Sequence, residues 1–172
     1  MNLQENIHRI KEVMGLNEVA ENIDNIYPFE YYPPASHEYN PVHHYSFDTE
    51  TQKYNVRFFE KYPKKYYPDG TYERDYMTYD MGAFSGIEPI SDKSMTNEHK
   101  ALKVNATVMA ITIDWIERTP DFYQLIITPV DERRLNLVKR FCDNTLGGKY
   151  DILVDSMPGL YNKSVIIRSR GN

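Results

Sequence analysis

The chain has 172 residues, a formal net charge of −5 and 41% hydrophobic residues. This length and apolar content suit one folded domain with a substantial core and exclude wholesale disorder. The mild acidity argues against a general nucleic-acid binder, which needs a dense basic surface, and no apolar run approaches the roughly 20 residues of a membrane-spanning helix.

Two further features of the sequence concern the compartment. The N-terminal residues lack the unbroken apolar stretch of a signal peptide. The single cysteine, Cys142, cannot form a disulfide within the chain, so we expect a reducing compartment.

The first segment, 1–26, is predicted to be helical. Residues 2–14 form an amphipathic helix that Gly15 ends, and its apolar residues fall on one stripe: Leu3, Ile7, Ile10 and Met14. A second short helix is expected over 17–26, ended by Pro28. An isolated helix of this length is marginal in water, so the apolar stripe needs a partner surface, either on its own domain or on another protein.

Tyrosine and proline are concentrated in the next part of the chain. The chain has 15 Tyr and 10 Pro, and most of both lie before residue 80. The prolines predict an extended linker over 27–42. The tyrosines fit either strands that favour aromatic residues or a recognition surface. For the second reading, the expected contact residues are Tyr31, Tyr32, Tyr39, Tyr66 and Tyr67.

Period-two patterns predict an antiparallel hairpin over 43–61. A loop over 62–70 that ends in an Asp-Gly turn signal follows it, and then a third strand over 71–82. The stretch from Gly82 to Ser94 is expected to be a loop.

The remaining elements predict the fold class. A long helix over 96–120 is apolar nearly all round and should be central, and the apolar strand over 122–128 should lie inside a sheet. An amphipathic helix over 131–144 and two strands, 150–156 and 164–169, complete the chain. We therefore predict one α+β domain over 43–172, in which an antiparallel β-meander is followed by α-β-α-β-β elements on a mixed sheet.

Most of the reactive side chains fit structural roles. The adjacent residues His43 and His44 should point to opposite faces of a strand, which disfavours a zinc site with His37, and Cys142 should be a small core residue. A metal-dependent hydrolase could use carboxylates on or after the third strand, but their spacing favours a solvated face: Asp75, Asp80, Glu88 and Asp92. We expect no metal and no cofactor.

One pocket is predicted where the second long helix begins. Asp131, Arg133 and Arg134 directly follow the apolar strand, and ligands often bind beyond the carboxyl ends of such strands. Arginines there could hold a phosphate, whereas intrahelical pairing and compensation of the helix dipole explain the same residues without a ligand.

The stretch "HKALKVNATVMAITIDWIERTPDFYQLIITPVDERRLNLVKRF" resembles small uncharacterised α/β proteins of tailed bacteriophages and Bacteroidota. The shared features are an "ATV" triplet at 106–108, Pro120, the apolar strand 125–127 and Arg134 with Leu135, within a resemblance that covers 43–142. The chain departs from the pattern at Asn136, where a Tyr is usual. The resemblance implies the fold and a phage origin, and no activity.

Three Leu/Ile-any-Glu triplets lie in the first segment, at 3–5, 10–12 and 16–18. In large tailed phages, a protease cleaves capsid-targeting peptides after such triplets, so the N-terminal helix resembles a targeting or docking helix. Any amphipathic helix that contains glutamates also produces these triplets.

We therefore expect a non-enzymatic bacteriophage accessory protein that acts through protein–protein contacts, in the virion or against a host process in the host cytoplasm. Its partner would be a phage structural protein, a host protein or a second copy of the chain; a membrane is not expected, and nucleic acid is disfavoured. The alternative is a small phosphate-ester or nucleotide hydrolase with its pocket at Asp131, Arg133 and Arg134.

Overall fold

The computed structural model describes residues 26–35, 42–61, 64–66, 72–74, 77–85, 88–89, 98–156 and 163–170. Seven described strands precede the first described helix: β1 (Phe29–Tyr32), β2 (Val42–Asp48), β3 (Lys53–Lys61), β4 (Lys64–Tyr66), β5 (Tyr72–Arg74), β6 (Thr78–Ser85) and β7 (Glu88–Pro89). The later elements are α2 (Glu98–Arg118), β8 (Gln124–Ile127), α3 (Glu132–Leu146), β9 (Tyr150–Ser156) and β10 (Lys163–Ser169). The predicted helices over 2–14 and 17–26 lie outside the described residues, except for Ile26, which is not helical.

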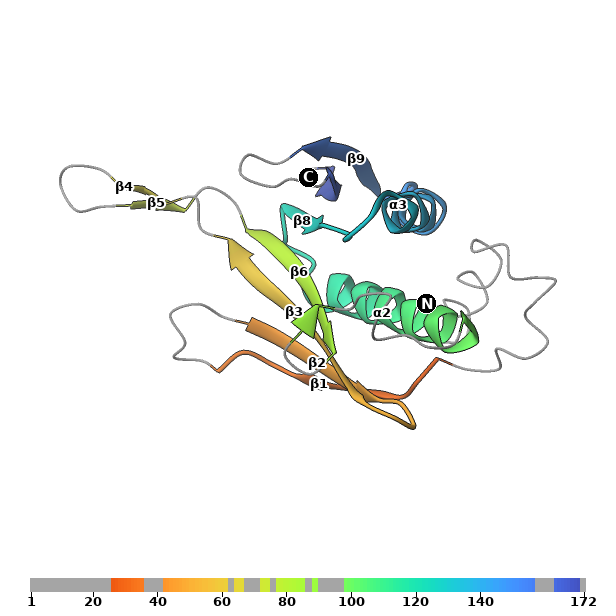
Figure 1. Cartoon of the computed structure of the whole chain (residues 1–172). Coiled ribbons are helices and arrows are strands. Elements are labelled where there is room, and N and C mark those ends of the chain that lie inside the picture. Colours follow the sequence, from red (N-terminus) through yellow and green to blue (C-terminus); the bar gives the residue numbers. More distant parts are fainter. Residues whose placement is uncertain are drawn as a thin grey trace.

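One mixed sheet organises the domain, with the strand order β1-β2-β3-β6-β8-β10-β9 and with β7 paired to β6 (Figure 1). Neighbouring strands are antiparallel except for β6 and β8, which are parallel and are connected through α2. A parallel pair requires such a crossover, and a helix usually supplies it. The predicted α+β class with a mixed sheet is confirmed, as is the position of the apolar strand β8 inside the sheet.

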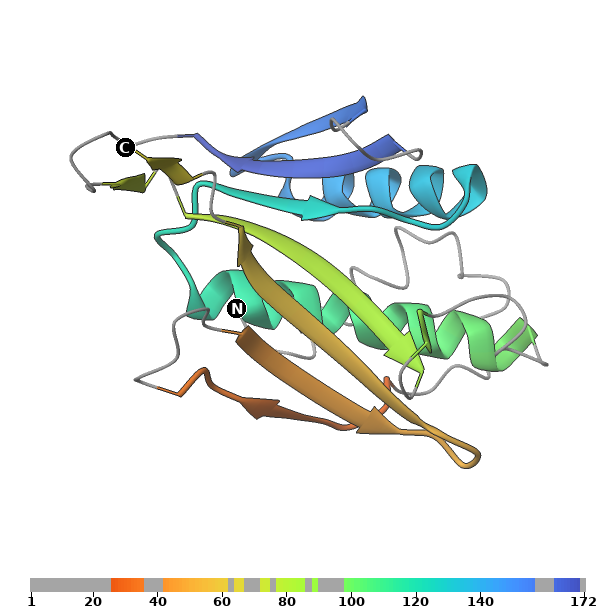
Figure 2. The same ribbon diagram turned by 60° about the vertical axis from the view of Figure 1, so that its left-hand side comes forward.

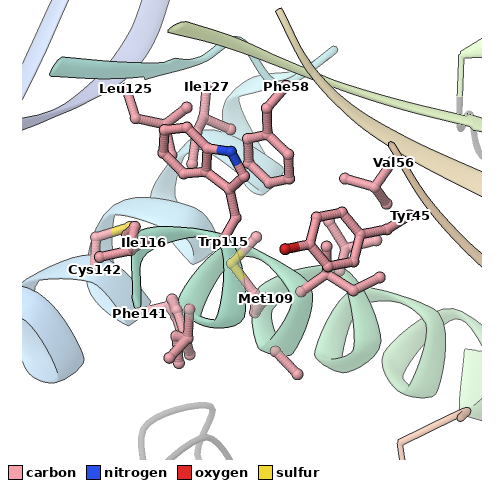
Figure 3. Close-up of a cluster of buried hydrophobic side chains, with 14 of the residues drawn as sticks. Tyr45, Val56, Phe58, Met109, Trp115, Ile116, Leu125, Ile127, Phe141 and Cys142 are labelled. Atoms are coloured by element: carbon pink, nitrogen blue, oxygen red, sulfur yellow. The ribbon is translucent and has the colours of Figure 1, made fainter. Parts of the chain in front are cut away.

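The helices α2 and α3 cover one face of the sheet (Figure 2). Alternate side chains of the main strands belong to the hydrophobic core beneath these helices. The register sets this common face: Tyr45 lies opposite Val56, which lies opposite Ala83, and across the parallel pair Tyr79 lies opposite Leu125. At the centre of the core, the indole of Trp115 on α2 stacks on the ring of Phe58 at 4.6 Å between centroids (Figure 3). The long helix is therefore central, as its apolar sequence predicts.

The expected linker over 27–42 contains part of the sheet. Residues 29–32 form the edge strand β1, which pairs with β2, and Tyr27 just before it is buried in the core. The sheet thus begins before residue 43, where we placed the domain boundary. The prolines flank β1 at positions 28, 33 and 34, so they bound the strand without interrupting it.

The third predicted strand is also wrong in its extent. Residues 72–74 form β5, which pairs with β4 in a separate two-stranded sheet, and only 78–85 join the main sheet. The Asp69-Gly70 turn signal lies between β4 and β5, so it connects a hairpin of its own and does not end a simple loop. The predicted loop over 82–94 begins too early, because β6 continues to Ser85 and is followed by β7.

None of the helices that the structure describes is long and apolar enough to cross a bilayer.

Candidate functional site

An apolar groove of about 350 Å³ lies between α2 and α3. The last half of β6 and the end of β8 contribute Met81, Ala83 and Ile127 to it, and the two helices contribute Val108, Met109 and Phe141. Figure 3 labels three of these side chains, Met109, Ile127 and Phe141, within the cluster that surrounds Trp115. The groove is therefore continuous with the core and is not an isolated surface depression.

The position of the groove follows from the one parallel pair in the sheet. Residues 81–84 of β6 and 127–130 at the end of β8 line it, so it lies at the carboxyl ends of both strands. Crevices at the carboxyl ends of parallel strands are the usual ligand sites of open α/β sheets. Val130, in the loop that follows β8, is 46% exposed and lies at the open side of the groove.

Few polar groups line the groove. Among the lining residues, Asn105, Thr128 and Arg134 carry polar side chains. The Thr128 hydroxyl shares a 2.7 Å hydrogen bond with the hydroxyl of Ser164. The Arg134 guanidinium lies 3.7 Å from the Asp131 carboxylate. Arg134 is thus the one charged residue in the lining, and its guanidinium lies beside the Asp131 carboxylate.

The structure brings one of the three predicted pocket residues to the groove. Arg134 lines it. Asp131 is the N-cap of α3, where its carboxylate accepts a 2.7 Å hydrogen bond from the backbone N–H of Arg134, and Arg133 is exposed. Intrahelical pairing, one of the two interpretations of the sequence, therefore accounts for Asp131.

The predicted contact tyrosines have different environments. The hydroxyl of Tyr31 shares a 2.9 Å hydrogen bond with Nδ1 of His43, and its ring lies 4.7 Å from that of Tyr45, whereas Tyr32 is exposed and packs against His44. Tyr66 lies on β4. Six predicted contact residues lie outside the described residues: Leu3, Ile7, Ile10, Met14, Tyr39 and Tyr67.

A polar network connects α2 to β1 and β2. The Tyr45 hydroxyl donates to the Asp114 carboxylate at 2.9 Å, and Arg118 Nε donates to the same oxygen at 2.5 Å. The Arg118 guanidinium also lies over the ring of Tyr31, 4.7 Å from its centroid. Burial, and then the nearby Asp114 carboxylate, raise the pKa of Tyr45, so this hydroxyl stays protonated as a donor.

Sequence reasoning missed this network because its members are far apart in the chain. A signal was present, since Asp114 stands between Ile113 and Trp115 in the apolar part of the helix, where an acidic side chain needs a partner. The network fixes α2 against the edge of the sheet, and it does not open into the groove.

The two adjacent histidines point to opposite faces, as predicted. His43 contacts the ring of Trp115 on the helix side, whereas His44 Nε2 hydrogen-bonds with Asn55 Oδ1 at 2.8 Å on the other side. Partial burial lowers the pKa of His43, so the half-buried imidazole is neutral near pH 7. Within the described residues, no three His, Cys, Asp or Glu side chains are grouped as metal ligands.

Cys142 is fully buried on α3, as its position on the helix predicts. Burial raises the pKa of its thiol from 9.0 to about 12, so it is not a thiolate near neutral pH.

Comparison of the chain with family models, with curated proteins and with solved structures finds no match. The function must therefore be argued from the geometry of the groove.

Proposed function

We propose that this chain is a non-enzymatic accessory protein that acts through protein–protein contacts and that the groove between α2 and α3 is its recognition site. The observation that supports this proposal is a groove of about 350 Å³ whose lining is apolar except for Asn105, Thr128 and Arg134. Such a groove suits apolar side chains from one face of a partner helix.

The free energy of such contacts comes from apolar area removed from water. A fully buried Leu, Ile or Phe side chain contributes about 1.5–3 kcal/mol, so a few anchors in the groove are enough for specific binding. Exposed Val130 would add to this contact, and Arg134 and Asn105 could orient a polar edge of the partner.

A phage origin, with a virion or host-cytoplasm location, is part of the same proposal and rests on the resemblance over 43–142 and on the three triplets in the first segment. The intact mass of the protein recovered from purified virions would test it, because the mass reports both packaging and cleavage after Glu12. The alternative proposal, a small phosphate-ester or nucleotide hydrolase, is supported by Arg134 alone.

Site-specific photocrosslinking tests the groove. A benzophenone amino acid replaces Val130 at the groove or Leu153 on β9, which is similarly exposed at 39%. In host cells, we expect position 130 to crosslink one partner protein and position 153 not to crosslink it. The same partner, once purified, should bind the chain. Equal crosslinking from both positions, or from neither, would contradict the proposal.

A further inference from the structure

The main sheet has two edge strands, β1 and β9, and they differ in how well they are protected. β1 has four residues, and prolines at positions 28, 33 and 34 flank it. Proline has no backbone N–H, so it hinders the addition of a further strand. β9 has seven residues without proline and ends the strand order of the sheet (Figure 1). One side of β9 pairs with β10, and no strand in the described part of the chain pairs with its other side.

The strand β9 is exposed although its centre is apolar. Leu153 is 39% exposed and Val154 is 37% exposed, on opposite faces of the sheet. On the helix side, Val154 lies opposite the fully buried Val165, so it extends a row of core side chains to the edge. An edge strand presents a row of backbone N–H and C=O groups, and with apolar side chains it is a template for pairing with a strand of another chain.

We propose that β9 pairs antiparallel with β9 of a second copy of this chain, about a two-fold axis at Ile152. The axis stands perpendicular to the sheet, so residues that lie opposite each other share a face. Ile152 then lies opposite the partner's Ile152, and Tyr150 lies opposite the partner's Val154. These side chains belong to the helix side, so each pair on that side is apolar and the sheet continues from one copy into the other.

The charges of β9 favour this axis over the nearest alternatives. On the face away from the helices, Lys149 comes opposite the partner's Asp155, and both residues are exposed. An axis at Leu153 would place Asp151 opposite the partner's Asp155, and an axis at Asp151 would place the two copies of Asp151 opposite each other. Like charges that lie directly opposite each other are destabilising.

The remaining charge of the strand, Asp151, is also accommodated. Its carboxylate accepts a 2.8 Å hydrogen bond from Arg170 Nε of the same chain, and it lies opposite the partner's Leu153. An axis at Val154 would also avoid opposed carboxylates, but it would bring no cation opposite an aspartate. Of the axes within 151–154, the one at Ile152 therefore combines apolar pairs with opposite charges.

The pairing of one strand edge makes a small interface. Interfaces below about 1,200 Å² usually belong to weak complexes, so we expect monomers at roughly 5 µM and dimers at roughly 1 mM. The folding of each copy does not depend on the pairing. The proposal is also independent of the groove between α2 and α3, since β9 contributes no residue to its lining.

Sedimentation of the full chain between these concentrations tests the dimer, and charge reversal tests the register. Lys149→Asp should raise the dimer Kd about tenfold, because it opposes like charges in two symmetric pairs. Asp155→Lys should do the same, and the double variant should restore the dimer. Arg133→Asp on α3 is the control, because it changes the charge equally at another exposed position and should leave the Kd unchanged.

Circular dichroism should show that these variants remain folded, since the changed residues are exposed. A chain that stays monomeric at the highest concentration would overturn the proposal. Reversals that do not rescue each other, or an equal effect of Arg133→Asp, would also overturn it.

Cysteine substitution locates the axis. In Ile152→Cys the two thiols lie opposite each other, where Cα atoms are about 4.5–5.5 Å apart and a disulfide can form. In Val154→Cys the thiols are four positions out of register, about 13 Å along the strands, although this position is more exposed. Mild oxidation should therefore give a covalent dimer only from Ile152→Cys, and buried Cys142 should not compete. Equal crosslinking of both variants, or of neither, would overturn the register.

Discussion

The two halves of the sheet pack different side chains against the two helices. In the aromatic half, β2, β3 and β6 contribute most of the rings that pack against α2. In the aliphatic half, β8 and β10 contribute the branched side chains Leu125, Ile127, Val165 and Ile167. On the aromatic half, the stacked rings and the Tyr45–Asp114–Arg118 network hold α2 tightly against the sheet. The groove lies between α2 and α3, where the carboxyl ends of β6 and β8, one strand from each half, form its floor.

Under the proposed function, α2 has a structural side toward the rings of the sheet and a binding side toward the groove. Rings fill space in large, flat units and bring hydroxyl groups that need partners, so they favour a closed layer. Aliphatic side chains carry no polar group, so they can line a groove without unpaired hydrogen-bonding atoms. We therefore expect changes on the aromatic half to affect stability and changes at the mouth of the groove to affect binding.

The largest effect should come from Trp115→Ala. Trp115 is fully buried and contacts the rings of Phe58, Tyr79 and Phe122, so its truncation should lower the free energy of unfolding by about 3–5 kcal/mol. Urea denaturation followed by circular dichroism measures this, since the variant lacks the only Trp of the chain. Trp115→Phe is the control and should lose much less, because the indole N–H has no hydrogen-bond partner in the described structure. A loss below that of an ordinary surface substitution would contradict the central role of the ring.

Tyr45→Phe should have the next largest effect. The change removes the hydroxyl that donates to the Asp114 carboxylate, and hydrogen bonds to charged groups contribute about 1.5–3 kcal/mol. The same urea experiment measures the loss. Tyr32→Phe is the matched control, because Tyr32 is exposed and its loss should be near zero. Equal losses in the two variants would show that the network does not fix α2.

The free energy of unfolding should fall at high pH because of Cys142, which α3 buries in the core. Burial raises the pKa of the thiol from 9.0 to about 12. The contribution of the protonated thiol to the free energy of unfolding is therefore fully present below pH 9 and is lost as the pH rises toward 12. At pH 10.5, the thiol ionises in the unfolded chain and not in the folded one, which corresponds to a loss of about 2 kcal/mol from this group. Urea midpoints at pH 8 and pH 10.5 measure the effect.

The control for this pH dependence is Cys142→Ala. Between pH 8 and pH 10.5, this variant should lose only the part of the free energy of unfolding that the tyrosines contribute. Tyr45 acts in the same direction, because its raised pKa keeps it protonated in the folded chain while the unfolded chain ionises. An identical pH dependence in the wild-type chain and in Cys142→Ala would show that the thiol is not responsible.

Sequence patterns predict the elements with long apolar periods and miss the contacts that depend on distant residues. The extents of α2, β8 and α3 follow from periodicity, capping by Asp131 and the prolines around them. The edge strand β1 is missed because its four residues are stable only when paired with β2, and proline-rich flanks hide it. The predicted third strand over 71–82 is divided between β5 and β6. This division depends on the pairing of β5 with β4, whose three residues carry no strand pattern of their own.

The candidate site was predictable only at one edge. Arg134, which lines the groove, follows the end of a buried strand at the start of a helix, and this pattern marks the carboxyl edge of a sheet. The other wall of the groove comes from Val108 and Met109, which the sequence assigns to the core in general, and the parallel pairing of β6 with β8 brings the two walls together. No local pattern indicates that pairing, because residues of the two strands that lie opposite each other are 46 positions apart, as in Thr78 and Gln124.

The smallest effect on stability should come from Val130→Asp. This variant best separates an effect on binding from an effect on folding. Val130 is 46% exposed in the loop after β8, so a carboxylate there stays in water, and the free energy of unfolding should change by less than about 0.5 kcal/mol. Binding of the purified partner should nevertheless be lost, because apolar partner side chains would have to displace water from the new charge at the mouth of the groove. Leu153→Asp adds the same charge at a similarly exposed position on β9 and should keep both stability and binding. Loss of binding in both variants would mean that charge alone weakens the complex, so the groove would not be its recognition site.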